Sequence, residues 1–197
     1  MRLVLASASP RRAELLTAAG FTFEVLAVDL DERARPGEAP ADYVRRLAAE
    51  KSARAFELLE GSARENPAVV LGADTAVVVG GEILGKPVHD GDAERMLRLL
   101  SGRAHDVMTG ISLRSAAGEA GGIGTTTVWF ARLSPDDIAQ YVARGEWRGK
   151  AGAYAIQGFA SRFIPRIEGS YSNVVGLPVA LVSEALKRGA VDVASWG

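Results

Sequence analysis

The sequence predicts an α/β fold, because apolar segments of strand length alternate with segments of helical periodicity along the chain. The clearest strand is the run of mostly β-branched residues at 69–79, which is typical of a strand buried on both faces. With 197 residues, of which 48% are hydrophobic and 24% charged, the chain has an ordinary globular composition and can bury a large core. We therefore expect residues 1–197 to form a single domain, either undivided or with two lobes.

Composition excludes several classes of function. The formal net charge of −1 gives no general attraction to nucleic acid or to an anionic membrane, and no apolar run approaches the roughly 20 residues of a membrane span. The absence of cysteine excludes thiolate metal sites and a cysteine nucleophile, and two histidines are too few for a multi-histidine metal site. A metal would bind to oxygen atoms, which favours Mg2+ or Mn2+. The first residues lack the apolar core of a signal peptide, so we expect a cytoplasmic protein.

The first strand is predicted at 3–6, and Ser9 is a suitable N-cap for a helix that ends before Gly20. Arg11 and Arg12 fall in the first turn of this helix, where the helix dipole disfavours a cation. Their position is explained if an anion such as a phosphate group binds at this helix N-terminus. The alternative is a solvated pair of arginines.

A short strand is predicted at 21–26, and the acidic residues at 29–32 follow it in a polar stretch. Such a cluster is usually a solvated loop, although it could also bind a divalent cation. A long helix is predicted from residue 40 or 41 to about 59, and Lys51 lies on its apolar face. This lysine either extends to the rim of the buried face or meets an anion in a pocket.

Asp74 lies in the middle of the buried strand, where an ionised carboxylate needs a partner, a metal or an opening to a cleft. The Gly-Gly pair that follows this strand predicts a hairpin in which Val79 faces Glu82. The same register places Thr75 opposite Lys86, so Asp74 and Lys86 are expected to meet at the open end of the hairpin. They could form a structural ion pair or the edge of a functional site.

The second half of the chain continues the alternation of elements. The predicted helices run from 90 or 92 to 100 and from 134 to 145, and a last helix ends near 188. Ser134 as the cap and Pro135 at the first helical position mark the start of the second of these. The predicted strands are 105–113, 125–133 and 161–167. The first two are predicted to form a hairpin with a loose tip at the glycine-rich stretch 118–122, and the stretch 169–178 is predicted as a loop. The stretch 150–158 is small and punctuated by glycine, which is typical either of a tightly packed loop or of backbone that approaches a ligand. Within the stretch 150–158, the side-chain amide of Gln157 could donate to and accept from the edge of a base.

Basic residues at several motifs, together with the acids Glu32 and Asp74, form the combination that chemistry on a triphosphate requires. The cations offset the charge of the substrate, and a carboxylate binds a metal or activates a water molecule. The candidate cations are Arg11, Arg12, Lys51, Lys86 and Lys150. The sequence has no Walker A motif and no dinucleotide-binding glycine fingerprint after its first strand. Neither histidine lies in a motif that supports a catalytic triad.

These segments together resemble the Maf family of nucleoside triphosphate pyrophosphatases, once described as septum-formation inhibitors. The resemblance runs nearly from end to end, and its motifs are specific in combination. They are SASPRR at 7–12, the acidic loop at Glu32, RLAAEKS at 46–52, LGADT at 71–75, GKP at 85–87, SGR-x-H-x-V-x-T at 101–109, KAGAYAIQG at 150–158 and GSYSNVVGLP at 169–178.

The resemblance implies a fold related to the inosine triphosphate pyrophosphatases, with a mixed, twisted sheet, flanking helices and two lobes around a central cleft. It implies an enzyme that hydrolyses a nucleoside triphosphate to the monophosphate and pyrophosphate, with Mg2+ or Mn2+ as cofactor, and it suggests a homodimer. The chain looks like the dTTP/UTP branch, whose role would be the house-cleaning of nucleotide pools, modified pyrimidine nucleotides included. No nucleic-acid or membrane partner is expected.

The resemblance also implies roles for individual residues. Asp74 matches the proton acceptor of the family, and Lys51 and Lys86 match further positions that the family places in its site. Glu32 and Asp74 are the expected metal ligands. The expected substrate-binding residues are Ser7, Arg11, Arg12, Thr75 and Gln157, and three of these (Arg12, Thr75 and Gln157) match the positions linked to the choice of base.

Two further readings stay open at this point. The 7-methyl-GTP branch of the same family differs at the base-choice positions, so it ranks second. The other reading is a nucleotide-sensing regulator of cell division and septum formation in which hydrolysis is vestigial or absent. The intact Asp74 and the lysines favour an enzyme, because a protein that only binds nucleotides does not need an acid that activates water.

Overall fold

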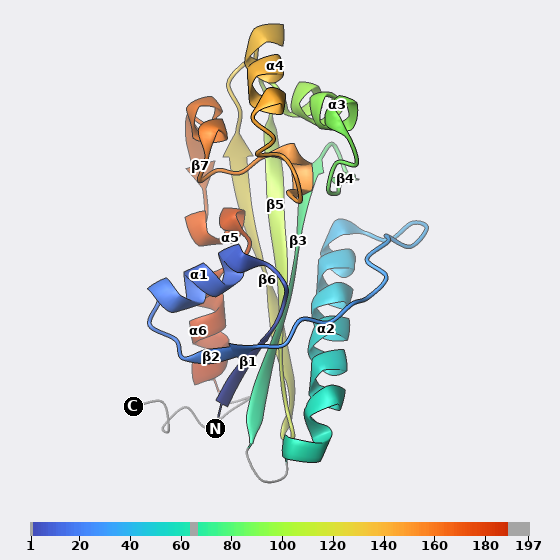
Figure 1. Cartoon of the computed structure of the whole chain (residues 1–197), viewed down its shortest axis with the longest axis vertical. Coiled ribbons are helices and arrows are strands. Elements are labelled where there is room, and N and C mark those ends of the chain that lie inside the picture. The colour runs from blue at the N-terminus through green and yellow to red at the C-terminus, as the bar shows by residue number, and fades with distance from the viewer. Residues whose placement is uncertain (1, 64–66, 189–197) are drawn as a thin grey trace. The chain divides into compact units, whose positions relative to one another are not determined.

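A computed structural model of the chain describes residues 2–63 and 67–188 (Figure 1). Its strands are β1 (Arg2–Ala6), β2 (Phe23–Val25), β3 (Ala68–Val79), β4 (Glu82–Leu84), β5 (Ala104–Ser115), β6 (Gly118–Trp129) and β7 (Arg166–Glu168). Its α-helices are α1 (Pro10–Ala18), α2 (Pro40–Ala63), α3 (Asp90–Leu100), α4 (Pro135–Ala143), α5 (Tyr171–Val175) and α6 (Val179–Lys187). Two short 3-10 helices are η1 (Ala151–Ala153) and η2 (Phe159–Phe163).

The strands form one seven-stranded sheet of mixed direction, in the order β2-β1-β3-β5-β6-β7, with β4 paired to β3. Strand β1 is parallel to both β2 and β3, whereas the pairs β3–β4 and β6–β7 are antiparallel. Since antiparallel neighbours need only a tight turn and parallel neighbours need a crossover, helices α1 and α2 connect the three parallel strands. The mixed α/β class that the sequence predicts is confirmed.

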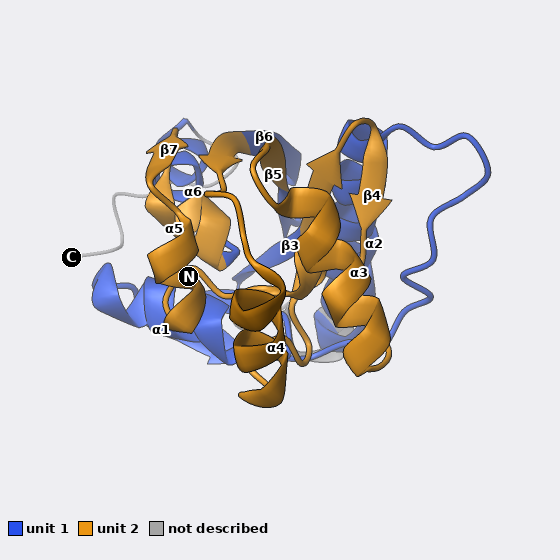
Figure 2. Cartoon of the chain, turned by 90° about the horizontal axis from the view of Figure 1, so that it is seen from above, with its two compact units in different colours: residues 1–74, 109–124, 176–197 blue, residues 75–108, 125–175 orange. Residues whose placement is uncertain are grey.

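The chain divides into two compact units, which Figure 2 colours separately. The first unit comprises residues 1–74, 109–124 and 176–197, and the second comprises residues 75–108 and 125–175. Strands β3, β5 and β6 contribute residues to both units. The expected arrangement of two lobes around a central cleft stays a prediction, and the two units are described separately below.

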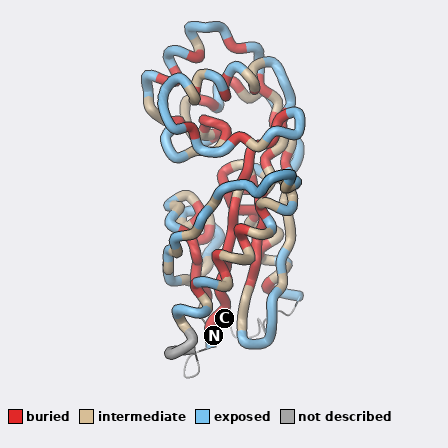
Figure 3. Tube along the Cα trace, turned by 90° about the vertical axis from the view of Figure 1, so that its right-hand side faces the viewer, coloured by how far each residue is buried: buried red, intermediate tan, exposed pale blue. Residues whose placement is uncertain are grey.

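The first unit has a helical layer on each face of its strands (Figure 1). Because neighbouring strand residues point to opposite faces, Leu3 and Leu5 pack with α1 and α6 while Val4 and Ala6 pack against α2. The same alternation holds in β3, where residues 69 and 71 face α1 and α6, and residues 68 and 70 face α2. Buried residues therefore follow the strands (Figure 3). The prediction that 69–79 is a strand buried on both faces is confirmed.

The second unit has its own core of aromatic side chains. Phe130 and Tyr154 pack edge to face with ring centroids 4.9 Å apart, and both contact the imidazole of His105. Tyr141 and Phe163 extend the cluster, and the first of these lies on α4, which packs against α3. These rings supply the buried area that allows a unit built from short elements to be compact.

Local signals in the sequence predicted several element ends correctly. Ser134 caps α4 and forms a reciprocal capping box with Asp137, and a proline occupies the first turn of both α1 and α4. The hairpin register is also confirmed, since Val79 pairs with Glu82. Strand β4 ends at Leu84, so the ladder stops short of the position at which Thr75 would face Lys86.

Three glycine-rich or short segments differ from the prediction. Residues 118–122 belong to strand β6 and not to a loop. A glycine is needed at position 121 because a Cβ atom there would lie too close to the carbonyl oxygen of Ile111 on the neighbouring strand. Most of the strand predicted at 161–167 is instead the 3-10 helix η2 followed by the short strand β7. The loop predicted at 169–178 contains helix α5.

Within residues 2–63 and 67–188, no helix combines the length and the apolar character that crossing a membrane requires.

Candidate active site

Lys51 and two carboxylates form the centre of the candidate site in the first unit. The Nζ atom of Lys51 lies 2.6 Å from Oδ1 of Asp74 and 2.6 Å from Oε1 of Glu32. Lys51 and Asp74 are only 6% and 7% exposed, so this ion pair is largely shielded from water. Two carboxylates that share one buried ammonium group define a position with a strong preference for positive charge.

The packing of β3 against α2 produces this arrangement. Gly72 and Asp74 follow Val70 on the face of β3 that α2 covers, because side chains on one face recur every second residue. A Cβ atom on Gly72 would lie 2.1 Å from the carbonyl oxygen of Ala48, so the helix and the strand are in backbone contact at this point. This close approach allows the Lys51 side chain to reach Asp74. The prediction that Lys51 lies on the buried face of the helix is confirmed.

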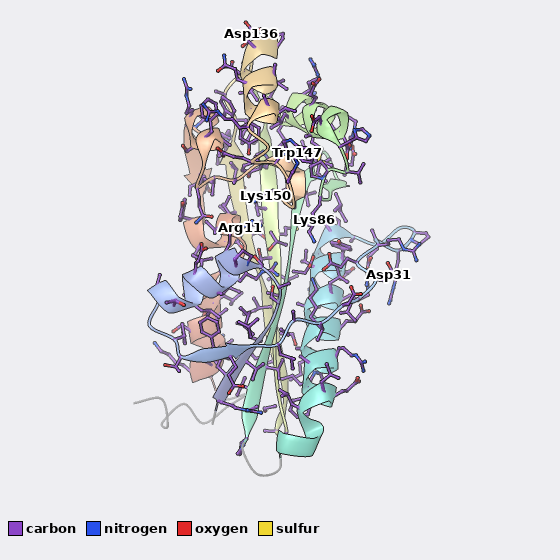
Figure 4. The ribbon with its side chains drawn as sticks, viewed as in Figure 1. Arg11, Asp31, Lys86, Asp136, Trp147 and Lys150 are labelled. Atoms are coloured by element: carbon purple, nitrogen blue, oxygen red, sulfur yellow. The ribbon has the colours of Figure 1, made fainter. Side chains whose placement is uncertain are left out.

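Glu32 reaches the site from the loop between β2 and α2. The hydroxyl of Tyr43 on α2 donates a hydrogen bond of 2.9 Å to the carbonyl oxygen of Glu32, which anchors the loop. Burial, together with the negative charges of Asp74 and Glu32, raises the pKa of Tyr43 to about 12. Among the neighbouring acids, Asp31 instead forms an ion pair with Arg33 on the exposed loop (Figure 4). The sequence did not identify Tyr43 as part of the site, because its spacing indicated only a position on the apolar face.

The N-terminus of α1 contributes Ser7 and Arg12 to the same unit. Arg12 donates one hydrogen bond of 2.8 Å to the carbonyl oxygen of Gly176 and another of 3.0 Å to Oγ of Ser7. The same Ser7 oxygen accepts a hydrogen bond from the backbone N–H of Ser9. Burial lowers the pKa of Arg12, and the charges of Asp74 and Glu32 partly offset this shift. Arg12 is therefore a fixed buried cation under the influence of both carboxylates, which excludes the alternative of a solvated arginine.

Arg11 differs from its neighbour because it is only partly buried (Figure 4). Burial lowers the pKa of Arg11, and the nearby carboxylate of Glu14 acts in the opposite direction. Its guanidinium group lies in the first turn of α1, where the partial positive charge of the helix already favours an anion. Arg11 is thus the more accessible of the two arginines for a contact with phosphate.

The remaining candidate residues lie in the second unit. Thr75 is partly buried in β3, whereas Lys86 and Gln157 are exposed. The backbone N–H of Gly152 donates a hydrogen bond of 3.1 Å to the carbonyl oxygen of Gly85, which joins the segment of Lys150 to the segment of Lys86. Figure 4 shows these two lysines on adjoining stretches of chain. The expected meeting of Asp74 with Lys86 stays a prediction, because the two residues belong to different units.

The carboxylates at the centre of the site suit a hard divalent cation. Glu32 and Asp74 already place two oxygen atoms around one positively charged atom, and oxygen is the ligand that Mg2+ and Mn2+ prefer. Within the described ranges 2–63 and 67–188, no group of three or more histidine, cysteine or acidic side chains forms a fuller metal cage. Two carboxylates with the other positions left to water and substrate phosphate are the usual arrangement for Mg2+. The donor set therefore fits such an ion.

Comparisons with known proteins agree with these features. A family model described as Maf-like protein matches residues 2–189. A dTTP/UTP pyrophosphatase of Shewanella oneidensis is 54% identical to the chain, over 94% of the chain and 98% of that protein. A dTTP/UTP pyrophosphatase of Hahella chejuensis is 48% identical, over 98% of the chain and 94% of that protein. A dTTP/UTP pyrophosphatase of Geobacter sulfurreducens is 50% identical, over 95% of the chain and 96% of that protein.

Solved structures with a distant likeness also exist. The Ham1 protein of Staphylococcus aureus is 18% identical with a TM-score of 0.44, over 66% of the chain and 72% of that structure. Protein VC0702 of Vibrio cholerae is 14% identical with a TM-score of 0.41, over 95% of the chain and 94% of that structure.

Proposed function

The chain belongs to the Maf-like protein family, and on that premise we propose that it is a nucleoside triphosphate pyrophosphatase that hydrolyses dTTP and UTP. The observation that carries the substrate assignment is the identity of about half of all residues, over nearly the whole chain, with proteins named dTTP/UTP pyrophosphatase. The products are the nucleoside monophosphate and pyrophosphate. The role that follows is the house-cleaning of nucleotide pools, and modified pyrimidine nucleotides are included among the substrates.

Asp74 is the proposed proton acceptor. A water molecule attacks the α-phosphorus, the bond from this phosphorus to the oxygen that bridges it to the β-phosphorus breaks, and pyrophosphate leaves. Lys51 binds Oδ1 of Asp74 at 2.6 Å and fixes the orientation of the carboxylate. We assign Oδ2 as the atom that takes the proton from the water. A buried carboxylate held in one orientation avoids the cost of reorganisation during the reaction.

The basic residues are proposed to bind and neutralise the triphosphate. Arg11 offers the accessible guanidinium group at the α1 N-terminus, and the buried Arg12 and Ser7 shape the backbone there. Lys51 and Lys86 complete the set of cations that stabilise the charge developing on the leaving pyrophosphate. Because these cations offset the negative charge that develops on the leaving pyrophosphate, they lower the barrier to bond cleavage.

Base choice is proposed to depend on Arg12, Thr75 and Gln157. This assignment rests on the match of these residues to the family positions linked to base choice. An exposed side-chain amide such as that of Gln157 can both donate to and accept from the edge of a pyrimidine.

Glu32 and Asp74 are the proposed ligands for Mg2+ or Mn2+. When bound, such an ion would neutralise part of the triphosphate charge and polarise a phosphoryl oxygen. The closeness of the two carboxylates supports this proposal, because both lie 2.6 Å from one Nζ atom and are therefore near enough to bind one ion together.

We further propose that residues 1–197 function as a single domain, with the two units as its lobes, and that the protein is a cytoplasmic homodimer. Neither nucleic acid nor a membrane is a proposed partner, given the formal net charge of −1. Light scattering on the eluted peak of a size-exclusion column would measure the mass of the oligomer.

The proposed activity is tested with a panel of nucleoside triphosphates that includes dTTP, UTP and 7-methyl-GTP, each with Mg2+ or Mn2+. We expect pyrophosphate and monophosphate from dTTP and UTP, and a fall in kcat of at least about 100-fold in Asp74→Asn. Asp136→Asn, which changes an exposed carboxylate on α4, is the matched control (Figure 4).

Other outcomes of the panel identify the competing functions. A preference for 7-methyl-GTP would assign the protein to the 7-methyl-GTP branch of the family. Tight nucleotide binding without product would favour a nucleotide-sensing regulator of cell division. Full turnover in Asp74→Asn would remove Asp74 from its proposed role.

A further inference from the structure

The backbone around Gln157 is held in place from both sides by α4 and the turn that follows it. On one side, the N–H of Ala155 donates a hydrogen bond of 3.2 Å to the hydroxyl of Tyr141. On the other side, the N–H of Phe159 donates a hydrogen bond of 2.8 Å to Oε2 of Glu146. Gln157 lies between these two anchored positions and has an exposed side chain.

The segment between the two anchors is a tight turn. The N–H of Gly158 donates a hydrogen bond of 3.0 Å to the carbonyl oxygen of Ala155, which closes the turn around Gln157. A Cβ atom on Gly158 would lie 2.1 Å from Oε2 of Glu146, so the carboxylate lies directly against the backbone. The turn therefore fixes the Cα position of Gln157 while its amide stays available to a ligand.

The groups that hold the turn are themselves part of a rigid core. Tyr141 has no exposed surface, and its ring lies 6.0 Å from that of Phe163 and 6.4 Å from that of Phe159. Burial raises the pKa of Tyr141 to about 12, so its hydroxyl stays neutral and can accept the hydrogen bond from Ala155. Glu146 lies in the turn that follows α4, three residues after the helix ends at Ala143, so both anchors come from this helix and its C-terminal turn.

This arrangement bears on selectivity because an amide can discriminate between bases only if it is held within hydrogen-bonding tolerance of the correct base edge. We propose that Tyr141 and Glu146 are positioning residues that set base selectivity by fixing the backbone on either side of Gln157. The proposal rests on the proposed function, in which Gln157 contacts the base. It does not require either residue to touch the nucleotide.

The test compares Tyr141→Phe and Glu146→Ala with the wild-type enzyme on dTTP and on GTP. The loss of one anchoring hydrogen bond is expected to reduce the ratio of kcat/KM for dTTP to that for GTP by about three- to tenfold. We expect KM for dTTP to rise while kcat stays nearly constant, because neither substitution alters the groups that act on the phosphates. Glu146→Gln is expected to restore the ratio, because its amide oxygen can still accept the Phe159 N–H.

Matched controls separate positioning from a general effect on the fold. Tyr171→Phe and Glu168→Ala make the same chemical changes at exposed positions of the same unit and should leave the ratio unchanged. In a Gln157→Ala background, Tyr141→Phe and Glu146→Ala should no longer alter the ratio, because they act through Gln157.

An unchanged ratio in folded Tyr141→Phe would overturn the proposal, and so would an equal loss with and without Gln157. Tyr141→Phe removes a single oxygen atom, so the test remains available if Glu146→Ala does not fold. Wild-type turnover of dTTP tests the proposed function separately. If wild type binds nucleotides without turnover, the same comparison is made with Kd values for dTTP and GTP. A wild-type protein that binds neither nucleotide would overturn the positioning role as well.

Discussion

Lys51 is the residue on which the candidate site depends most directly, because it forms ion pairs with two carboxylates from different parts of the chain. Asp74 comes from a central strand and Glu32 from a loop, and both bind the same Nζ atom at 2.6 Å. Removing one member of a buried ion-pair group leaves the others uncompensated, which costs more than the net stabilisation by the group. The consequences of replacing Lys51 should therefore extend beyond catalysis.

We expect Lys51→Met to lower the free energy of unfolding by about 2–4 kcal/mol at pH 8, because Asp74 is left buried and unpaired beside Glu32. Urea unfolding of wild type and Lys51→Met measures this deficit. Lys187→Met, which replaces an exposed lysine on α6, should change stability by less than about 0.5 kcal/mol.

The double variant Lys51→Met/Asp74→Asn provides the decisive comparison for this cluster. Because asparagine carries no charge, most of the stability lost in Lys51→Met should return. No recovery in the double variant would contradict a cluster stabilised by charge compensation.

His105 gives the second unit a defined dependence on pH. Burial beside Phe130 and Tyr154 lowers the pKa of His105 from 6.5 to about 4, and its Nε2 atom lies 2.8 Å from the Tyr154 hydroxyl. The unfolded chain takes up a proton below about pH 6.5, whereas the folded chain does not until about pH 4. The stability that comes from the neutral imidazole is therefore complete above pH 6.5 and declines as the pH falls toward 4.

We expect acidification across this range to remove at most about 3 kcal/mol of stability through His105. Chemical unfolding of wild type and His105→Gln at several pH values isolates this contribution, since the variant should lack it. His89→Asn, which replaces the exposed histidine before α3, is the matched control. Parallel pH profiles for wild type and His105→Gln would show that the imidazole does not cause the decline.

At the scale of elements, the contact between β3 and α2 sets the distance between Asp74 and Lys51. We expect Gly72→Ala to destabilise the protein by about 3 kcal/mol or more, because its Cβ atom would overlap the backbone of α2 at Ala48 and Ser52. Gly85→Ala adds the same methyl group where no atom lies within 4 Å and should change stability by less than about 1 kcal/mol. Thermal unfolding compares the two. Equal melting temperatures would contradict the proposed backbone contact.

The elements that could be predicted from sequence carry explicit local signals. The cap and proline at Ser134 and Pro135 specified the start of α4, and the Gly-Gly pair specified the register of the β3–β4 hairpin. The glycines at 118–122 were misleading, because loops favour glycine for its conformational freedom while β6 uses it for close packing. Short elements such as α5 and η2 gave no periodic signal, since one helical turn is too short to show a repeat.

The same distinction applies to the site. Asp74 and Lys51 could be identified individually, as a carboxylate in a buried strand and a lysine on a buried helical face. Their pairing with each other and with Glu32 could not be predicted from spacing, because it depends on how α2 crosses β3 and on the Tyr43 contact that anchors the loop. The meeting of Asp74 with Lys86 was expected from the hairpin register, and it stays a prediction.

At the scale of the whole molecule, a formal net charge of −1 conceals a strongly uneven distribution of charge. The first unit buries Lys51, Arg12 and Asp74, with the partly exposed Glu32 beside them. Most other ion pairs in the described residues lie on the surface, where each contributes little to stability. Buried charges of this kind are costly to maintain and are concentrated at functional sites, which supports the proposed role of this cluster.

The central claim is that water attacks the α-phosphorus of a pyrimidine nucleoside triphosphate at a site built around Asp74. Hydrolysis of dTTP in 18O-labelled water, followed by mass spectrometry of both products, tests this claim most directly. The account predicts that the label appears in thymidine monophosphate and that the pyrophosphate is unlabelled. Label in the pyrophosphate, or release of orthophosphate in its place, would contradict it.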